Sequence, residues 1–527
     1  MSYYNLGYLF LALPIAVMIY RMIPKKYRYI FLLFLSLGFF VIGSKIRILF
    51  LLSSIVSIYL GARKMNKIDL EKDEVLSKAE KDAKKELKEK YKAKKKSILL
   101  LTIVFNVLFL FIFKYLKFFT INTNAILDML HINYNIPTFK FLAPMGISFY
   151  TLTALSYLID VYNGKVKAED NILKVALYVS FFPQIIEGPI NSYSEETQKT
   201  LFEGRKITFK EFCFAYQRIL LGLFKKIVIA DRLNFAVGKI FRKYAVITGM
   251  TSAFGVVAYT IMLYMEFSGT MDIVMGTGEL FGVKLPENFR QPFFSKNVSE
   301  FWMRWHISLG TWFKNYIFYP VSLSKRMKKL TIGARKKLGN HFGPLISGAV
   351  ALFAVWSLNG LWHGAGWPFL LFGMYHFFMI LLGNIFEPVV IKVCDKLHIN
   401  RKNIFYRIFQ SIKMTIFIFI GELFFRAPTV EVGFKMLTNI FTNFTFKMKE
   451  FKAINLDAQD YIILIISIIF IFIIGLLKER NVNIREEISK KNAVIRWSLY
   501  LFLILAIAFF GAYGIGYAPV DPIYADF

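Results

Sequence analysis

Apolar stretches long enough to approach a membrane span recur along the whole chain. A spanning helix needs about 20 mostly apolar residues. Of the 527 residues, 56% are hydrophobic and 17% aromatic, which exceeds what one soluble core requires. The first stretch has no basic region ahead of it and no A-x-A site, so we interpret it as a retained span rather than a signal peptide. The candidate segments are 6–20, 29–40, 46–60, 97–113, 172–186, 212–230, 252–265, 345–361, 368–386, 404–420, 461–477 and 495–512.

These segments predict an all-α integral membrane protein with roughly ten to thirteen spans or half-spans. Pro and Gly interrupt the chain at 143–146 and again at 182–189. Irregular backbone at membrane depth occurs where it is buried in protein or lines a cavity. We therefore expect some segments to enter the membrane, turn back and line a cavity.

The basic residues gather between the apolar runs and predict an orientation in the membrane. The net charge of +31 comes from 66 Lys and Arg against 35 Asp and Glu. The positive-inside rule places the clusters at 63–96, at Lys225 and Lys226, and at 325–337 on the cytoplasmic face. If residues 345–362 rise as a helix from the last cluster at about 1.5 Å per residue, they carry residue 363 about 25 Å inward. That residue is a histidine.

One long polar insertion occupies residues 61–97. Its segment 63–96 holds 14 Lys and Arg and 8 Asp and Glu, a net charge of +6. Acidic residues lie four positions before lysines, as in Glu74 with Lys78, which predicts a solvated helix that extends the neighbouring spans. Nucleic-acid binding is the alternative, but only Tyr91 offers an aromatic ring to stack on a base. We therefore expect no nucleic-acid partner.

Metal and covalent-serine chemistry have no motif in this sequence. The two cysteines, Cys213 and Cys394, cannot build a disulfide framework or a tetrahedral zinc site. A nucleophile elbow, a P-loop and a metal-ligand motif are also missing from the sequence. We therefore expect neither a bound metal nor a bound cofactor.

Two polar segments stand out among the apolar runs. The first, NVSEFWMRWHISLGTWFKNYIFYP at 297–320, is too polar for a lipid-facing helix and contains Arg304, His306 and Lys314. The second, SLNGLWHGAGW at 357–367, surrounds His363 with glycines. Polar groups deep in a bilayer are costly and face a cavity or a partner, so both segments are candidate functional sites.

Two interpretations of each histidine stay open on these grounds. His363 is either a core histidine bonded to a neighbouring helix or a general base that accepts a proton from a hydroxyl at neutral pH. His306 either orients a substrate or is an interfacial side chain beside Trp302 and Trp305. Glu266 and Asp272 are acidic groups at the end of an apolar run, six positions apart, which does not place them on one helix face.

In these segments the chain resembles the membrane-bound O-acyltransferase superfamily, of the bacterial alginate O-acetyltransferase type. The order and spacing of the segments agree over most of the chain. The resemblance is carried by PMGISFYTLTALSYLIDVYNGK at 144–165, SFFPQIIEGPI at 180–190, GLFKKIVIADRLN at 222–234, LPENFRQPFFSKNVSEFWMRWHISLGTWFKNYIFYP at 285–320, SLNGLWHGAGWPFLLFG at 357–373 and LFFRAP at 423–428.

The resemblance implies a fold with about 11–13 transmembrane or re-entrant helices around a central funnel. It implies that His363 matches the catalytic histidine of the family and His306 its second characteristic histidine. Related bacterial members often read FDFSGYSD where this chain reads MEFSGTMD at 265–272, which leaves acceptor and donor specificity open. The residues expected to contact substrate are Trp302, Arg304, Trp305, Glu266, Asp272, Asn359 and Trp362.

The resemblance also implies a function. We expect an acyltransferase of the bacterial plasma membrane that moves an acetyl group from a cytoplasmic thioester, acetyl-CoA, for O-acetylation of an exported or cell-wall polysaccharide. An extracytoplasmic SGNH-type acetyltransferase is the implied partner, and Arg304 and Lys314 are candidates to hold donor phosphates. The expected organisation is 1–60 for N-terminal spans, 61–97 for the charged insertion, 98–430 for the catalytic core and 431–527 for C-terminal spans.

Three alternatives remain at this stage. D-alanyl transfer to teichoic acid uses a carrier-protein thioester in place of acetyl-CoA, although those relatives are typically shorter. A proton-coupled transporter uses histidines as relays and leaves its cargo chemically unchanged. A scaffold of an export complex predicts that loss of His363 is silent.

Overall fold

The structure is a computed structural model that describes residues 3–5, 7–139, 141–193 and 196–513. These residues form helices and no named strand. Within them, eight segments are long and apolar enough to cross a membrane, and the shorter apolar segment Tyr8–Met22 adds to these. The prediction of an all-α integral membrane protein is confirmed.

The chain divides into two compact units, and the first comprises Met1–Ala215 and Val274–Pro286 within the described residues. Its longest helices, α3 (Ile48–Lys78) and α4 (Ala83–Leu110), lie side by side as a hairpin. The other elements of this unit are η1 (Tyr8–Ala12), α1 (Leu13–Met22), η2 (Lys25–Tyr27), α2 (Arg28–Ser44), η3 (Lys45–Arg47), η4 (Phe111–Tyr115), α5 (Leu116–Met129), α6 (Ile147–Tyr162), α7 (Ile172–Ser180) and α8 (Glu196–Glu203).

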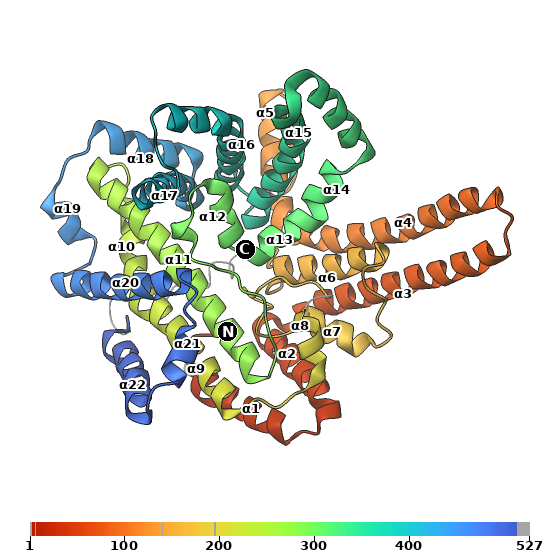
Figure 1. The fold of residues 1–527 in the computed structure, drawn as a ribbon, viewed down its shortest axis with the longest axis horizontal. Coiled ribbons are helices and arrows are strands. Elements are labelled where there is room, and N and C mark those ends of the chain that lie inside the picture. Colours follow the sequence, from red (N-terminus) through yellow and green to blue (C-terminus); the bar gives the residue numbers. More distant parts are fainter. Residues whose placement is uncertain (1–2, 6, 140, 194–195, 514–527) are drawn as a thin grey trace. The chain divides into compact units, whose positions relative to one another are not determined.

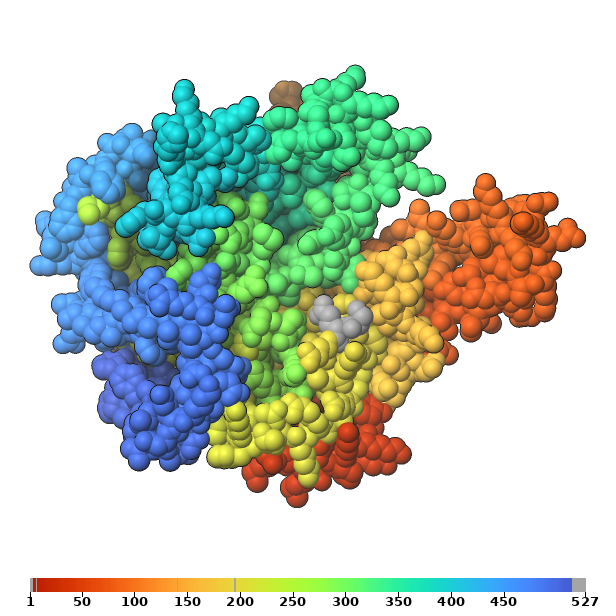
Figure 2. All heavy atoms as spheres, in the orientation of Figure 1, coloured from red at the N-terminus to blue at the C-terminus, as the bar shows by residue number. Residues whose placement is uncertain are grey.

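The charged insertion forms the end of this hairpin, as predicted. Figure 1 shows α3 and α4 continuing past α6 of the same unit, and Figure 2 shows the surface of their tip. Glu74 and Lys78 form the expected pair at 2.8 Å. One lysine turns inward, since Lys95 of α4 is buried and pairs with Asp69 of α3. This contact fixes the two helices against each other.

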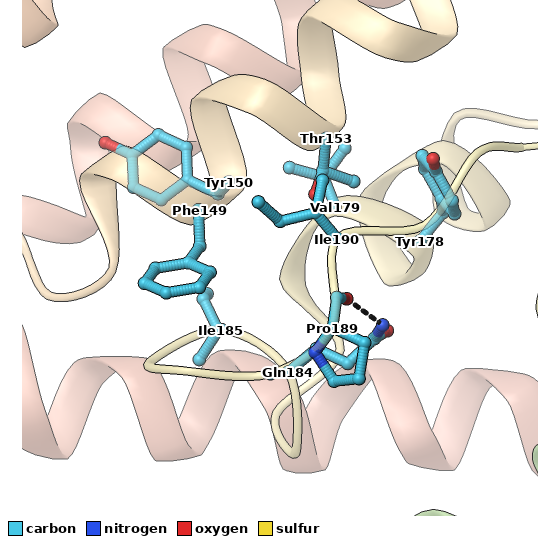
Figure 3. A pocket seen from close by; sticks show the side chains of 10 residues that line it. Phe149, Tyr150, Thr153, Tyr178, Val179, Gln184, Ile185, Pro189 and Ile190 are labelled. Atoms are coloured by element: carbon cyan, nitrogen blue, oxygen red, sulfur yellow. Dashed lines mark hydrogen bonds between the residues drawn. The ribbon is translucent and has the colours of Figure 1, made fainter. Parts of the chain in front are cut away.

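The segment 181–190 is irregular and buried. The predicted apolar run 172–186 is helical only as far as Ser180, nine residues in α7, so it is too short to be a span. Pro183 and Gly188 follow, and the Gln184 side chain donates to the carbonyl of Pro189 at 2.8 Å. Figure 3 shows this bond beside a cavity of about 10 Å³. The Gln184 side chain thus satisfies a backbone carbonyl of this irregular segment.

Gly146 permits the close contact on which this irregular segment depends. It has a φ of 67°, and a Cβ there would lie 1.8 Å from the carbonyl oxygen of Ile185. Only glycine tolerates both the conformation and the approach. The two interruptions expected from the sequence, 143–146 and 182–189, therefore pack on each other.

The second unit comprises Tyr216–Ile273 and Glu287–Ile523, described to residue 513. Two helices contribute residues to both units, α9 (Phe209–Leu223) and α11 (Gly249–Leu280). The remaining elements are η5 (Phe224–Ala230), α10 (Asp231–Arg242), η6 (Pro292–Phe294), α12 (Val298–Arg304), α13 (Ile307–Phe313), η7 (Lys314–Phe318), α14 (Tyr319–Ser322), α15 (Lys325–His363), α16 (Trp367–Lys396), α17 (Ile404–Arg426), α18 (Val430–Thr442), α19 (Met448–Ala453), α20 (Ala458–Glu479), α21 (Ile484–Ser489) and α22 (Ala493–Phe510).

A carboxylate from α19 caps the start of α11 in this unit. One oxygen of Glu450 accepts from the backbone N–H of Thr248 at 2.9 Å and from the hydroxyl of Thr251 at 2.6 Å. Partial burial acts to raise the pKa of Glu450, but the hydrogen bonds from the two threonines and the charge of Lys447 outweigh it and hold the pKa below its usual value. The ionised carboxylate is the stabilising form.

This cap predicts a pH-dependent loss of stability. Since the folded pKa is depressed, the contribution of Glu450 is complete above its unfolded pKa, near 4.5, and is lost as the pH falls through the folded pKa. Glu450→Ala is expected to lower the free energy of unfolding by about 1–2 kcal/mol at pH 7. The difference between wild type and variant should shrink toward pH 3 in denaturant titrations in detergent. Glu431→Gln, an exposed carboxylate on α18, is the control and should change little.

Candidate functional site

His306 and His363 line one cavity of the second unit. The cavity has a volume of about 480 Å³. Both histidines are buried, with 3% and 5% of their surface exposed. The sequence predicted two separate polar segments, and the structure brings them together. The lining residues are Ser299, Trp302, Met303, Trp305, His306, Ile307, Leu309, Gly310, Thr311, Phe313, Lys314, Phe318, Leu352, Val355, Trp356, Asn359, His363 and Ile380.

The turn between α15 and α16 positions His363. Helix α15 ends at this residue because Gly364 adopts an extended backbone, with φ −175°. The imidazole meets aromatic rings edge-on, with centroid distances of 5.1 Å to Phe425 and 5.9 Å to Phe372. These contacts restrict the orientation of the imidazole ring.

Glycines let the two helices approach closely behind this histidine. A Cβ on Gly373 would lie 2.3 Å from the carbonyl oxygen of Trp356, and one on Gly360 would lie 2.5 Å from that of Phe369. Both distances are below any normal van der Waals contact. Of the glycines noted in the sequence around His363, Gly360 therefore serves helix packing, together with Gly373 of α16.

This packing predicts opposite effects at two glycines of α16. Gly373→Ala is expected to destabilise the protein by about 1–3 kcal/mol, because the methyl group overlaps the backbone of α15. Gly383→Ala on the same helix meets nothing within 4 Å, and should be neutral or stabilising by up to about 1 kcal/mol. Unfolding midpoints of both variants in detergent test this. Equal effects at the two sites would contradict the packing argument.

His306 sits at a break between α12 and α13, with a φ of 48°. Its Nδ1 lies 3.3 Å from Oδ1 of Asn288, which also accepts from the backbone N–H of Ser308 at 2.9 Å. Because that oxygen is an acceptor, this network assigns the proton to Nδ1. In this tautomer Nε2 carries the lone pair. Sequence analysis missed Asn288, although it lies within the motif at 285–320.

The ring of Trp362 adjoins both histidines. Its centroid lies 5.8 Å from that of His306 and 5.0 Å from that of His363. Trp305 is buried and lines the cavity beside His306. Of the aromatic residues that the sequence predicted as substrate contacts, Trp302 and Trp305 therefore line the cavity, and Trp362 packs against both histidines.

Trp302 is held from behind by a third histidine. Its indole N–H donates to Nδ1 of His376 at 3.3 Å. His376 is fully buried and also packs against Trp356, at 5.3 Å between centroids. His376 therefore supports two tryptophans of the cavity wall.

Four predicted substrate contacts lie outside the described lining of the cavity, and Trp362 is one of them. Arg304 forms ion pairs with Glu300 at 2.7 Å and Glu479 at 2.8 Å. Glu266 is fully buried within α11. Asp272, on the same helix, is held by cationic groups of two other elements, which are described below. Lys314, in contrast, lines the cavity and is exposed.

Asp272 is the centre of a buried ion-pair cluster. Lys225 donates to one carboxylate oxygen at 2.7 Å and Arg218 to the other at 3.2 Å. Arg218 also pairs with Glu287 at 2.6 Å. This arrangement joins α9, η5 and α11, and it occupies the carboxylate with charges of the protein itself. Among the described residues, no group of three His, Cys, Asp or Glu side chains is placed to hold a metal ion.

Comparisons with known proteins relate the chain to enzymes that transfer acyl groups. The sequence profile of the membrane-bound O-acyltransferase family matches residues 89–335. A probable alginate O-acetylase of Pseudomonas aeruginosa is 30% identical over 398 residues, which cover 75% of this chain and 70% of the relative. A peptidoglycan O-acetyltransferase of Helicobacter pylori is 30% identical over 371 residues, 64% of this chain and 63% of the relative. A teichoic acid D-alanyltransferase of Bacillus subtilis is 27% identical over 254 residues, 48% of this chain and 61% of the relative.

Proposed function

Since the chain belongs to the membrane-bound O-acyltransferase family, we propose that it moves an acetyl group from cytoplasmic acetyl-CoA across the membrane for O-acetylation of an exported or cell-wall polysaccharide. Family membership makes the chain an O-acyltransferase of the bacterial plasma membrane with several spans. The transporter and scaffold alternatives are therefore not retained. Donor, direction of transfer and acceptor are the proposed parts.

One observation carries the proposal, namely that His306 and His363 line the same cavity. In the proposed reaction, His363 accepts the proton of an acceptor hydroxyl while the hydroxyl oxygen attacks the carbonyl carbon of the thioester. The new C–O bond forms, the C–S bond breaks, and the thiolate leaves with the proton from the imidazolium. General-base catalysis of this kind is typically worth about 10²- to 10⁴-fold in rate.

The other residues of the cavity have supporting roles in this proposal. His306, fixed by Asn288, orients the substrate. The rings of Trp302, Trp305 and Trp362 exclude water from the reacting groups. Lys314, a cation in the lining, is our candidate to bind an anionic part of the donor.

The acetyl donor is favoured over a D-alanyl carrier by the extent of similarity. The alginate O-acetylase relative shares 30% identity over 75% of this chain. The teichoic acid D-alanyltransferase relative shares 27% over 48%. An extracytoplasmic SGNH-type acetyltransferase that completes the transfer to the polysaccharide is the partner we propose from the resemblance of the motifs.

Thioester cleavage by the purified protein in detergent tests the donor. Acetyl-CoA and a D-alanyl carrier protein are offered in parallel, with a polysaccharide acceptor or the partner added. We expect turnover with acetyl-CoA. Turnover with the carrier alone would replace the acetyl donor by the D-alanyl donor, and turnover with neither, once acceptor and partner are present, would contradict the proposal.

A further inference from the structure

Asn359 presents an amide to the cavity that no described part of the protein uses. Its side chain is buried, with 8% of the residue exposed, and lines the cavity that contains His306 and His363. Its Oδ1 is shielded from solvent and has no hydrogen-bond partner among the described residues. Two other buried amides are bonded by the protein: Asn288 accepts from Ser308, and Asn106 donates to Ser57 and to the carbonyl of Thr102.

An unbonded buried amide is unfavourable for folding, because it loses its bonds to water and gains none in return. Native proteins satisfy the great majority of such groups, and the exceptions require an explanation. Apolar side chains line the same cavity, among them Leu309, Val355 and Ile380. A bound ligand that supplies the missing hydrogen bond gives a direct explanation.

The position of Asn359 relates it to the reacting centre. Asn359 and His363 lie four residues apart on α15 and therefore on the same face of the helix. Their backbones are about 6 Å apart along the helix axis. A group bonded to Asn359 is thus about one helical turn from the atom on which His363 acts.

We propose that Asn359 is a specificity-determining residue, whose amide pairs with an amide or hydroxyl group of the substrate one helical turn from the reacting carbon. This inference rests on the proposed function of His363. The required chemistry, a hydrogen-bond donor near the thioester, has two sources. It is the amide nearest the sulfur of a pantetheine-type donor, or a second hydroxyl of a sugar acceptor.

Binding measurements on the full chain in detergent test the inference without turnover. Trp302, Trp305 and Trp356 line the cavity, so quenching of tryptophan fluorescence reports occupancy. The first probe pair is S-acetonyl-pantetheine, a non-hydrolysable thioether, and its analogue methylated on the amide nitrogen nearest the sulfur. The second pair is methyl glucoside and its monodeoxy analogues.

Three variants are compared with wild type. Asn359→Leu removes the amide, and Asn359→Ser keeps a smaller donor and acceptor. Ser357→Ala is the control, because the Ser357 hydroxyl bonds within its own helix, to the carbonyl of Phe353.

In one of the two pairs, wild type and Ser357→Ala should bind the probe that keeps the N–H or hydroxyl group about tenfold or more tighter than the probe that lacks it. Asn359→Leu should bind both members equally, and Asn359→Ser should retain part of the preference. A preference within the first pair shows that Asn359 binds the amide of the thioester donor. A preference within the second pair shows that it binds a hydroxyl of the sugar acceptor.

Three results would overturn the inference: preference that survives Asn359→Leu, no preference in wild type, or no binding of either pair. If Asn359→Leu does not fold, Asn359→Ser decides, because an unreduced preference in that variant also contradicts the role. Cleavage of acetyl-CoA is measured separately. A wild type that binds with the expected preference but cleaves no thioester would contradict the proposed function alone.

Discussion

Replacing His363 with glutamine is expected to lower the rate of acyl transfer by about 10²- to 10⁴-fold. Glutamine fills a similar volume and can form hydrogen bonds, but it cannot accept a proton from a hydroxyl at neutral pH. The fold should persist, since glutamine can occupy the space of the imidazole between Phe372 and Phe425. Initial rates of thioester consumption at saturating donor, with equal amounts of folded protein, give the measurement.

His341→Gln is the matched control for this variant. His341 is on the same helix but is exposed, and its ring bonds to the carbonyl of Asn384 at 3.0 Å. We expect this variant to keep the wild-type rate. Equal rates for His363→Gln and wild type would remove His363 from the reaction, and equal losses in both variants would point to a general effect on the helix.

Replacing Asp272 with asparagine is expected to lower the free energy of unfolding by about 3–5 kcal/mol, because it removes the counter-charge of buried Lys225 and one of the two carboxylates that pair with Arg218. Lys225 and Arg218 both donate to this carboxylate, and all three side chains are at most 10% exposed. Denaturant or SDS titration followed by circular dichroism measures the effect. The double variant Asp272→Leu with Lys225→Met removes both charges and should recover part of the loss.

Glu287→Gln provides the comparison, because Glu287 pairs with the same arginine but is 60% exposed. A loss below about 1 kcal/mol is expected there. If Asp272→Asn instead unfolds like wild type and only weakens donor or acceptor binding, Asp272 contacts substrate as the sequence predicted. Equal stability losses in the two variants would show that burial does not govern the cluster.

The sequence predicted the elements that depend on local pattern. The apolar runs that end at 361 and begin at 368 became α15 and α16, which meet at His363 as expected. The charged repeat at 63–96 became the hairpin, since its i, i+4 pairs favour helix in any context. Both histidines line one cavity, which the spacing of the two segments alone did not establish.

The parts that escaped prediction depend on partners far along the chain. The counter-charges of Arg304 and Asp272 come from Glu479 and Lys225, and no local pattern announces such pairs. The support of His306 by Asn288 and of Trp302 by His376 arises in the same way. The apolar run 172–186 looked continuous by hydropathy, but its helix ends at Ser180, before Pro183.

The hairpin of α3 and α4 has a consequence for how the protein is inserted during synthesis. Residues 63–82 balance six basic against six acidic side chains, whereas 83–96 hold eight lysines and two glutamates. The positive-inside rule keeps basic segments beside a span on the cytoplasmic side, so we expect the translocon to retain this tip in the cytosol. Helix α3 must then enter with its start outside and α4 with its start inside. Once the ribosome has passed residue 96, the cytosolic position of this tip sets the orientation of the helices that follow.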